Sequence, residues 1–145
     1  MIRNARIADV PAIVDIAVES VSRDPLPVKI DREAMAAMAR SLIGNPAHFI
    51  WVAEHDGQVA ACVAAQVGPG FWFRGLQASV LLFYARTPSA GALLLRKFAQ
   101  WCKSRSGIKL AVFELEPNVD PRIERLLNRL GFGRKSSNLT LVRQA

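Results

Sequence analysis

Near the middle of the chain, an apolar, strand-like run is followed at once by a long amphipathic helix, and this junction limits the folds that the chain can adopt. Residues 76–84 form the apolar run, Thr87 is a favourable N-cap, and Pro88 suits the first helical position because the N–H group that it lacks would have no partner there. The pattern predicts a helix from Pro88 to about Ser106, with Gly107 as its C-cap. Such a junction requires a sheet for the strand and a sheet face for the helix.

The start of this helix has the features of a phosphate-binding site. The backbone N–H groups of residues 89–91 are expected to lack partners inside the helix and to point along the positive end of its dipole. The side chains of residues 89–92 are small, so that an anion can approach the backbone, and Arg86 adds a forked cation. Capped strand-to-helix turns beside a surface arginine also occur where nothing binds, so the stretch by itself leaves both interpretations open.

The rest of the chain alternates between strand and helix patterns. Asp56-Gly57 joins two β-rich runs, residues 49–54 and 59–67, and Asp-Gly in this setting is the strongest short hairpin signal. A strand, a helix and a further strand in succession favour parallel pairing through a right-handed crossover. The chain therefore predicts an α/β fold with a mixed, partly parallel central sheet flanked by helices. The other expected elements are a strand over residues 1–7, a helix after Asp9, a helix after Asp31, a buried strand over residues 108–116, a helix opened by Asp120-Pro121 and ended by Gly131, and a final strand over residues 132–142.

Length and composition bound the class of protein. At 145 residues with 51% hydrophobic side chains, the chain is expected to form one domain over residues 1–145. It has no apolar run of about 18 residues, the length of a membrane-spanning helix, and its start lacks the apolar core of a secretory signal. We therefore expect a cytoplasmic protein without a membrane partner. Both a monomer and a homodimer stay open, because a sequence does not locate exposed apolar surface.

The two halves of the chain carry opposite charge. Residues 1–73 hold 6 Lys and Arg against 8 Asp and Glu, a net charge of −2, whereas residues 74–145 hold 13 against 4, a net charge of +9. The basic half contains the candidate phosphate turn, which indicates an anionic ligand or partner. Charge alone does not separate a nucleotide-like cofactor from nucleic acid or a membrane surface, and a solvated basic face is a further alternative.

The cysteines and histidines predict no metal site and no nucleophile. Cys62 and Cys102 lack metal-ligand spacing and are expected to be buried, reduced thiols. His48 and His55 adjoin expected turns and are interpreted as solvated histidines. No spacing of His, Cys and carboxylates suggests a metal, and two histidines so placed support no Ser-His-Asp triad.

The order of elements and three short motifs resemble the GNAT superfamily of acetyl-CoA-dependent N-acyltransferases over essentially the whole chain. The pyrophosphate loop of that family reads Q/R-x-x-G-x-G/A, and the segment from Arg86 to Gly91 matches it at the arginine and the final glycine, with Ser89 in place of the first glycine. Residues 126–132 keep the spacing of the family's Leu-Tyr-x-x-x-Gly-Phe helix end, and residues 8–13 resemble its first helix start.

The resemblance implies an enzyme that uses acetyl-CoA as co-substrate and a small-molecule or peptide amine as acceptor. The amine would attack the thioester directly, so the protein must hold CoA, align the amine and accept the ammonium proton. Backbone groups of residues 83–85 would pair with the pantetheine amides, and one N–H would polarise the thioester carbonyl. The cofactor-binding residues expected on this basis are Phe83, Tyr84, Ala85, Arg86, Thr87, Ser89, Ala90, Gly91 and Ala92.

Two residues are candidates for proton transfer. Glu116, at the exit of the expected strand, would accept the ammonium proton, and Tyr84, the single tyrosine, would protonate the departing thiolate. The alternative is that Glu114 and Glu116 are strand-end carboxylates paired with arginines. Leu127 stands where many family members keep a thiolate-protonating Tyr, and Gln77 falls near a strand position where many carry a catalytic Glu. Neither of these side chains can exchange the proton.

Two alternative functions, neither of them enzymatic, are also consistent with the sequence. Leu127 and Gln77 motivate a catalytically silent CoA-binding module of the same fold that serves regulation or interaction. A basic nucleic-acid-binding domain rests only on the charge of the second half, and it is the least favoured of the three functions.

Overall fold

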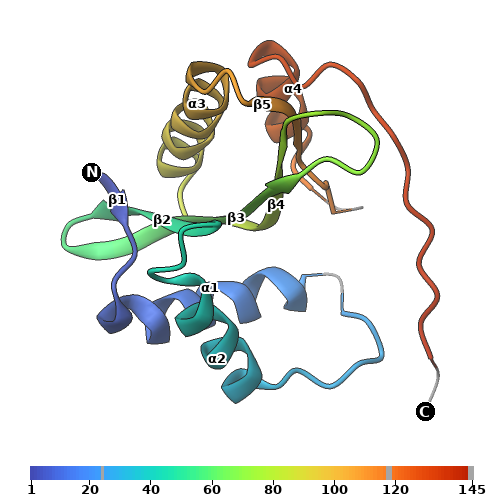
Figure 1. The fold of residues 1–145 in the computed structure, drawn as a ribbon. Helices are drawn as coiled ribbons and strands as arrows, with labels where there is room; N and C mark the ends of the chain where they lie inside the picture. Colours follow the sequence, from blue (N-terminus) through green and yellow to red (C-terminus); the bar gives the residue numbers. More distant parts are fainter. Residues whose placement is uncertain (24, 117–118, 144–145) are drawn as a thin grey trace.

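The computed structural model describes residues 1–23, 25–116 and 119–143. In chain order, its elements are β1 (Ile2–Asn4), the short 3₁₀ helix η1 (Ile7–Asp9), α1 (Val10–Ser22), α2 (Arg32–Leu42), β2 (His48–His55), β3 (Gln58–Pro69), β4 (Leu76–Ala85), α3 (Pro88–Ser104), β5 (Ile108–Val112) and α4 (Pro121–Arg129). The strands form one sheet in the order β1-β2-β3-β4-β5, in which β5 is parallel to β4 and the other neighbours are antiparallel. Helices α1 and α2 cover one face of this sheet, and α3 and α4 lie on the other (Figure 1). The predicted mixed α/β sheet is confirmed.

The hairpin between β2 and β3 forms where the sequence predicts it. Asp56 and Gly57 both adopt positive φ angles, 53° and 75°, and His55 pairs with Gln58 across the turn. Two consecutive positive φ angles are the geometry of a type I′ turn, which matches the right-handed twist of the flanking strands. The dipeptide therefore fixes the register of the two strands at the centre of the sheet.

An ion cluster holds the start of the chain against the sheet, where β1 is shorter than the predicted strand over residues 1–7. Asp9 stands at the predicted N-cap of α1, but its carboxylate accepts the backbone N–H of Arg6 (2.7 Å) and two N–H groups of Arg3 (2.7 and 2.9 Å) instead of an N–H of that helix. Arg3 also donates from Nε to Glu54 on β2 (2.8 Å). The Arg3 hydrogen bonds outweigh desolvation, and together with the Arg6 N–H they lower the pKa of Asp9 to about 2.

The face of α3 that meets the sheet is fully apolar. Leu94 and Phe98 are completely buried, and the Phe98 ring stacks on Trp101 with ring centroids 6.4 Å apart. Phe49 and Trp51 reach this cluster from β2, with centroids 4.6 Å apart. Aromatic side chains of this size bury the largest areas available to a protein. They fix the position of α3 over β2 and β3.

The C-terminal end of α3 lies slightly earlier than predicted. The last helical residue is Ser104, and Arg105, not Gly107, is the C-cap. The N–H of Ile108 donates to the carbonyl of Arg105 (3.0 Å), so the chain leaves the helix through a tight turn and enters β5 at once. The predicted end near Ser106 is wrong because the turn into the parallel strand takes these residues.

β5 differs from the buried strand predicted over residues 108–116. It ends at Val112 and lies at the edge of the sheet, where Leu110 and Val112 are exposed. The apolar run predicts extended backbone correctly over its first part, but a run of this kind does not say whether a second neighbour covers the strand. Here, among the described residues, no strand pairs with the outer edge of β5.

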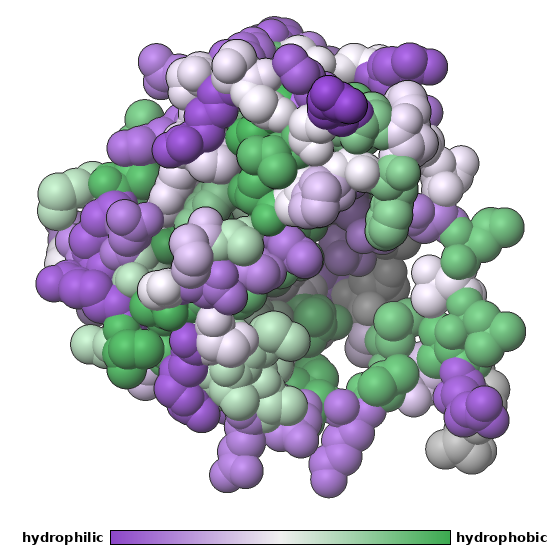
Figure 2. All heavy atoms as spheres, viewed as in Figure 1, coloured by the Kyte–Doolittle hydropathy of each residue, from purple (hydrophilic) through white to green (hydrophobic). Residues whose placement is uncertain are grey.

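The C-terminal segment after α4 is extended, as predicted, but over residues 132–142 it is not a strand of the sheet. Phe132 packs against Phe98 and Phe113, Lys135 forms an ion pair with Glu124 (2.8 Å), and Asn138 Nδ2 donates to Glu114 (2.6 Å). It runs down one side of the molecule (Figure 1), and exposed apolar side chains gather on that side (Figure 2). No helix of the described residues has both the length and the apolarity needed to cross a bilayer.

We predict that Asp9→Asn lowers the free energy of unfolding at pH 7 by up to about 2 kcal/mol. This value corresponds to the difference between the pKa of Asp9 in the folded protein and its ordinary pKa. A carboxyl with a lowered folded-state pKa stabilises the fold above its unfolded pKa and loses that contribution as the pH falls. The difference between wild type and variant should therefore close between about pH 4 and pH 2. Urea unfolding at several pH values measures it.

The matched control is Asp31→Asn, because Asp31 caps α2 by accepting the Ala34 N–H (3.0 Å) and asparagine caps equally well. Its effect on stability should be small at every pH. Equal losses in the two variants would contradict a special role of the Asp9 cluster.

Candidate active site

Strands β4 and β5 are paired only over the first half of β4. They pair from Leu76 with Ile108 to Ser79 with Val112, after which β5 ends and β4 continues to its last residue at position 85. A register shift against β3 leaves Leu81 as an extra residue on β4, and such a bulge bends the strand. Within the described part of the chain, residues 80–85 therefore have no strand partner on the side that faces β5.

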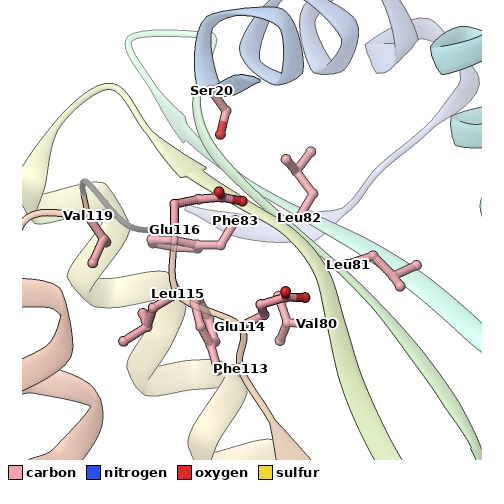
Figure 3. A pocket seen from close by; sticks show the side chains of 10 residues that line it. All are labelled: Ser20, Val80, Leu81, Leu82, Phe83, Phe113, Glu114, Leu115, Glu116 and Val119. Atoms are coloured by element: carbon pink, nitrogen blue, oxygen red, sulfur yellow. The ribbon is translucent and has the colours of Figure 1, made fainter. Parts of the chain in front are cut away.

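The wedge between the two strands contains a cavity of about 80 Å³. Residues 80–83 of β4 line one wall, the segment of residues 113–116 that follows β5 lines the other, and Ser20 of α1 closes it from the opposite face of the sheet. In Figure 3 the carboxylates of Glu114 and Glu116 point across the wedge toward β4, and the Ser20 hydroxyl points into the same space. Polar groups thus enter an otherwise apolar cleft from two separate elements.

The first turn of α3 follows directly on this wedge. Thr87 caps the helix as predicted, because its Oγ1 accepts the N–H of Ala90 (3.3 Å). The prediction of three free N–H groups is wrong for Gly91, whose N–H already donates to the Thr87 carbonyl (3.1 Å) in the first helical hydrogen bond. The Ser89 N–H has no partner among the hydrogen bonds of the described residues, and the Ala90 N–H is held only by a long bond to a side chain. These two groups are the ones that an anion can engage.

Gly91 serves the packing of α3 on β4. A Cβ atom at this position would lie 2.7 Å from the Cβ of Ala85 and 3.4 Å from the ring of Phe83. Contacts this short do not occur between carbon atoms of a relaxed structure, so any side chain would push the helix from the strand. The glycine therefore brings the N-terminus of α3 directly over the end of β4.

Arg86 and Tyr84 both contact the C-terminal part of α1. Arg86 forms a two-point ion pair with Glu19, from Nη2 (2.6 Å) and Nε (3.2 Å). Tyr84 is buried among the side chains that face α1, and its hydroxyl accepts a hydrogen bond from Arg23 (2.8 Å), whose guanidinium also lies over the ring. The hydrogen bonds of Arg86 lower the pKa of Glu19 below its ordinary value. Helix α1 thus supplies charged groups to a site whose sequence motif lies on β4 and α3.

Comparison with known proteins gives one decisive result. The model of the Acetyltransferase (GNAT) family matches residues 15–132, which include the wedge, the turn and α4. The chain belongs to the GNAT family. Among proteins with curated descriptions, no match is found.

Solved structures of GNAT acetyltransferases share the fold. A predicted acetyltransferase with acetyl-CoA from Clostridium acetobutylicum has a TM-score of 0.74 at 18% identity, over 98% of this chain and 95% of the other. An aminoglycoside acetyltransferase from an uncultured soil metagenomic sample, in complex with sisomicin, has a TM-score of 0.68 at 12% identity, covering 100% and 95%. Glucosamine-6-phosphate N-acetyltransferase from Arabidopsis thaliana has a TM-score of 0.68 at 14% identity, covering 99% and 97%.

Besides Ser89, this chain departs from the family pattern at Leu127 and Gln77, and both side chains have structural roles here. Leu127 is buried between α3 and α4 in a cluster with Leu95 and Leu126. Gln77 donates from Nε2 to Ser79 Oγ (3.2 Å) on the same strand. Neither contact supplies a proton donor or acceptor to the wedge.

The other titratable side chains give a mixed outcome. Cys62 and Cys102 are buried free thiols, as predicted, and burial raises their pKa values to about 12 and about 11. His55 is exposed, as predicted. His48 is less solvated than predicted, because it is only partly exposed and its Nδ1 is buried without a hydrogen-bond partner among the described residues. The part of the chain that the structure describes holds no cluster of three metal-ligating side chains.

Local sequence signals indicate the turn and the two glutamates, but they do not indicate the residues of α1. Glu19 and Arg23 are spaced four apart, which on a helix ordinarily indicates a solvated surface pair. Ser20 carries no motif at all. No local signal could have assigned these residues to the site, because the packing of α1 on β4 brings them there.

We predict that Gly91→Ala destabilises the protein by about 1–2 kcal/mol, because the steric cost of overpacking exceeds the gain in helix propensity of about 1 kcal/mol. Chemical denaturation of the purified variant measures the change. Gly68→Ala is the control, since a Cβ atom there meets nothing within 4 Å. Its stability should equal or slightly exceed that of the wild type, and equal losses in both variants would refute the close approach at Gly91.

Proposed function

We propose that this GNAT protein is an N-acetyltransferase that moves an acetyl group from acetyl-CoA to a primary amine by direct attack on the thioester. The observation that carries the proposal is the wedge between β4 and β5, one wall of which belongs to the strand that ends at Ala85, just before the first turn of α3. One end of such a cleft offers charges and N–H groups for a phosphate, and the other offers carboxylates for an amine.

The phosphate end consists of the N–H groups of Ser89 and Ala90 and the side chain of Arg86. Ser89 is exposed, and the helix dipole adds partial positive charge at the same point. A pyrophosphate bound here would direct the pantetheine arm back along residues 83–85 of β4. The unpaired backbone groups of that strand can then pair with the pantetheine amides as a neighbouring strand would, and an N–H aimed at the thioester carbonyl would stabilise the developing oxyanion.

The acceptor end contains Glu116, Glu114 and Ser20. Only a free amine attacks a thioester, so a group in the wedge must accept the ammonium proton, and we assign this role to Glu116. Glu114 accepts a hydrogen bond from Asn138, which leaves Glu116 as the better candidate. Structural neighbours that act on small molecules with amino groups, the aminoglycoside and glucosamine-6-phosphate acetyltransferases, support a small-molecule acceptor.

Tyr84 is our candidate for the acid that protonates the departing thiolate, although its hydroxyl is bonded to Arg23 and it does not line the cavity. A CoA-binding module without turnover is the second candidate function. It is favoured by Leu127, which lies in the apolar core where other members keep a tyrosine. Acetyl-CoA binding without acetyl transfer to any member of a broad amine panel would decide for it.

The first experiment is isothermal titration of acetyl-CoA into the wild type and the Arg86→Glu/Ser89→Glu variant. We expect the Kd to rise by at least about a hundredfold, because like charges placed against a bound anion cost several kcal/mol. A glutamate in the first turn is itself favourable for a helix, so the variant should fold.

The matched control is Arg96→Glu/Gln100→Glu, which makes the same total change of charge at exposed positions of α3 away from its N-terminus. Its Kd should change far less. If the folded wild type binds no acetyl-CoA, or if both variants weaken binding equally, the turn is not the phosphate-binding site.

For catalysis, we expect Glu116→Gln to lower kcat/KM by about a hundredfold or more while the Kd for acetyl-CoA is unchanged, because a general base typically contributes a factor of at least about 10². Steady-state kinetics with an amine found in the panel screen measure it. Glu114→Gln is the control from the same wall of the wedge and should have a much smaller effect. A Tyr84→Phe variant with the full rate would remove the acid role of Tyr84.

A further inference from the structure

We infer that Glu19 is an internal competitor for the cofactor: its carboxylate occupies the fork of Arg86 that a phosphate of acyl-CoA would take, and its release sets the affinity of the protein for that ligand. The inference rests on the proposed function, because it concerns the same phosphate turn. It assigns a role to a residue of α1 that lies outside every motif of the turn.

The contact between the two side chains uses the same atoms that recognise a phosphate. Arg86 donates to Glu19 from both Nη2 (2.6 Å) and Nε (3.2 Å), one hydrogen bond to each carboxylate oxygen. Bidentate recognition of carboxylate and of phosphate relies on the same planar fork of a guanidinium. While Glu19 holds this edge, a phosphate can reach only the remaining part of the guanidinium.

Both partners of the ion pair are anchored by other contacts, so the pair is a feature of the fold. The N–H of Arg86 donates to the carbonyl of Ala60 on β3 (2.8 Å), which anchors the backbone of the arginine. One helical turn beyond Glu19, Arg23 binds the buried Tyr84 through its hydroxyl and ring. Helix α1 is thereby held against the end of β4 with Glu19 in reach of Arg86.

The ion pair between Arg86 and Glu19 is also weak enough for a bound phosphate to replace Glu19. The side chains of Arg86 and Glu19 are 37% and 42% exposed, and exposed ion pairs contribute little because water screens them. A pyrophosphate would gain the fork of Arg86 together with the N–H groups of Ser89 and Ala90. It would at the same time repel the Glu19 carboxylate, since both are anions. Binding therefore exchanges one ion pair for another and leaves Glu19 without its partner.

This exchange predicts the sign of a simple variant. Glu19→Gln removes the competing charge and the repulsion of the bound anion, so the Kd for CoA should fall by about two- to fivefold at pH 7.5, the range set by the strength of exposed ion pairs. If Glu19 served instead to hold Arg86 in a binding conformation, the same variant would bind more weakly. The two roles are thus separated by direction alone.

The test is a double-mutant cycle by isothermal titration of CoA with the wild type, Glu19→Gln, Arg86→Gln and the double variant. We expect Glu19→Gln to tighten binding in the wild-type background and to have almost no effect once Arg86 is replaced. Asp15→Asn is the matched control, because Asp15 lies one turn earlier on α1 and its carboxylate is engaged by Arg32. It removes an equal charge from the same helix without freeing the fork of Arg86.

The outcomes are separable from those of the proposed function. A wild type that binds no CoA refutes the phosphate turn itself. If CoA binds, an unchanged or higher Kd for Glu19→Gln overturns the competition, as does a gain that persists in the Arg86→Gln background. An equal gain from Asp15→Asn also overturns it, since that result would reflect only the overall charge of α1.

Discussion

A β-strand with an unpaired edge inside a fold leaves backbone N–H and C=O groups that need other partners, and among the described residues β4 is such a strand beyond Ser79. β5 ends at Val112, and β4 continues with a bulge at Leu81 in its pairing with β3. The opening that results is the reason the molecule has a cleft at this point. Its walls, its glutamates and its approach to α3 all follow from the early end of one strand pairing.

The helix that follows β4 must lie close to that opening for the cleft to be useful. Aromatic packing of Phe98 and Trp101 fixes the body of α3, and Gly91 lets its first turn touch the end of β4. A bulkier residue would move the free N–H groups away from the strand edge. The small residues of this turn therefore have two roles. They let α3 pack closely on β4, and they leave room for an anion at the helix start.

Where a local signal decides the conformation, the predicted element forms. Asp56-Gly57 fixed the hairpin and Thr87-Pro88 the start of α3, because both depend on backbone preferences of adjacent residues. Where strand pairing or packing decides, the predicted bounds are wrong. The strand expected over residues 108–116 stops at Val112, and the strand expected over residues 132–142 joins no sheet in the part of the chain that the structure describes.

Neighbouring residues and composition are enough to predict most of the elements, the capped turn after β4 and the basic charge of the second half of the chain. Which residues face that turn depends on the tertiary structure. Glu19 belongs to a helix 67 residues away from Arg86 in the chain, yet their side chains are in contact. This contact depends on how α1 packs against β4. That packing is the sum of many side-chain contacts along the helix face, so no single residue or short motif predicts it.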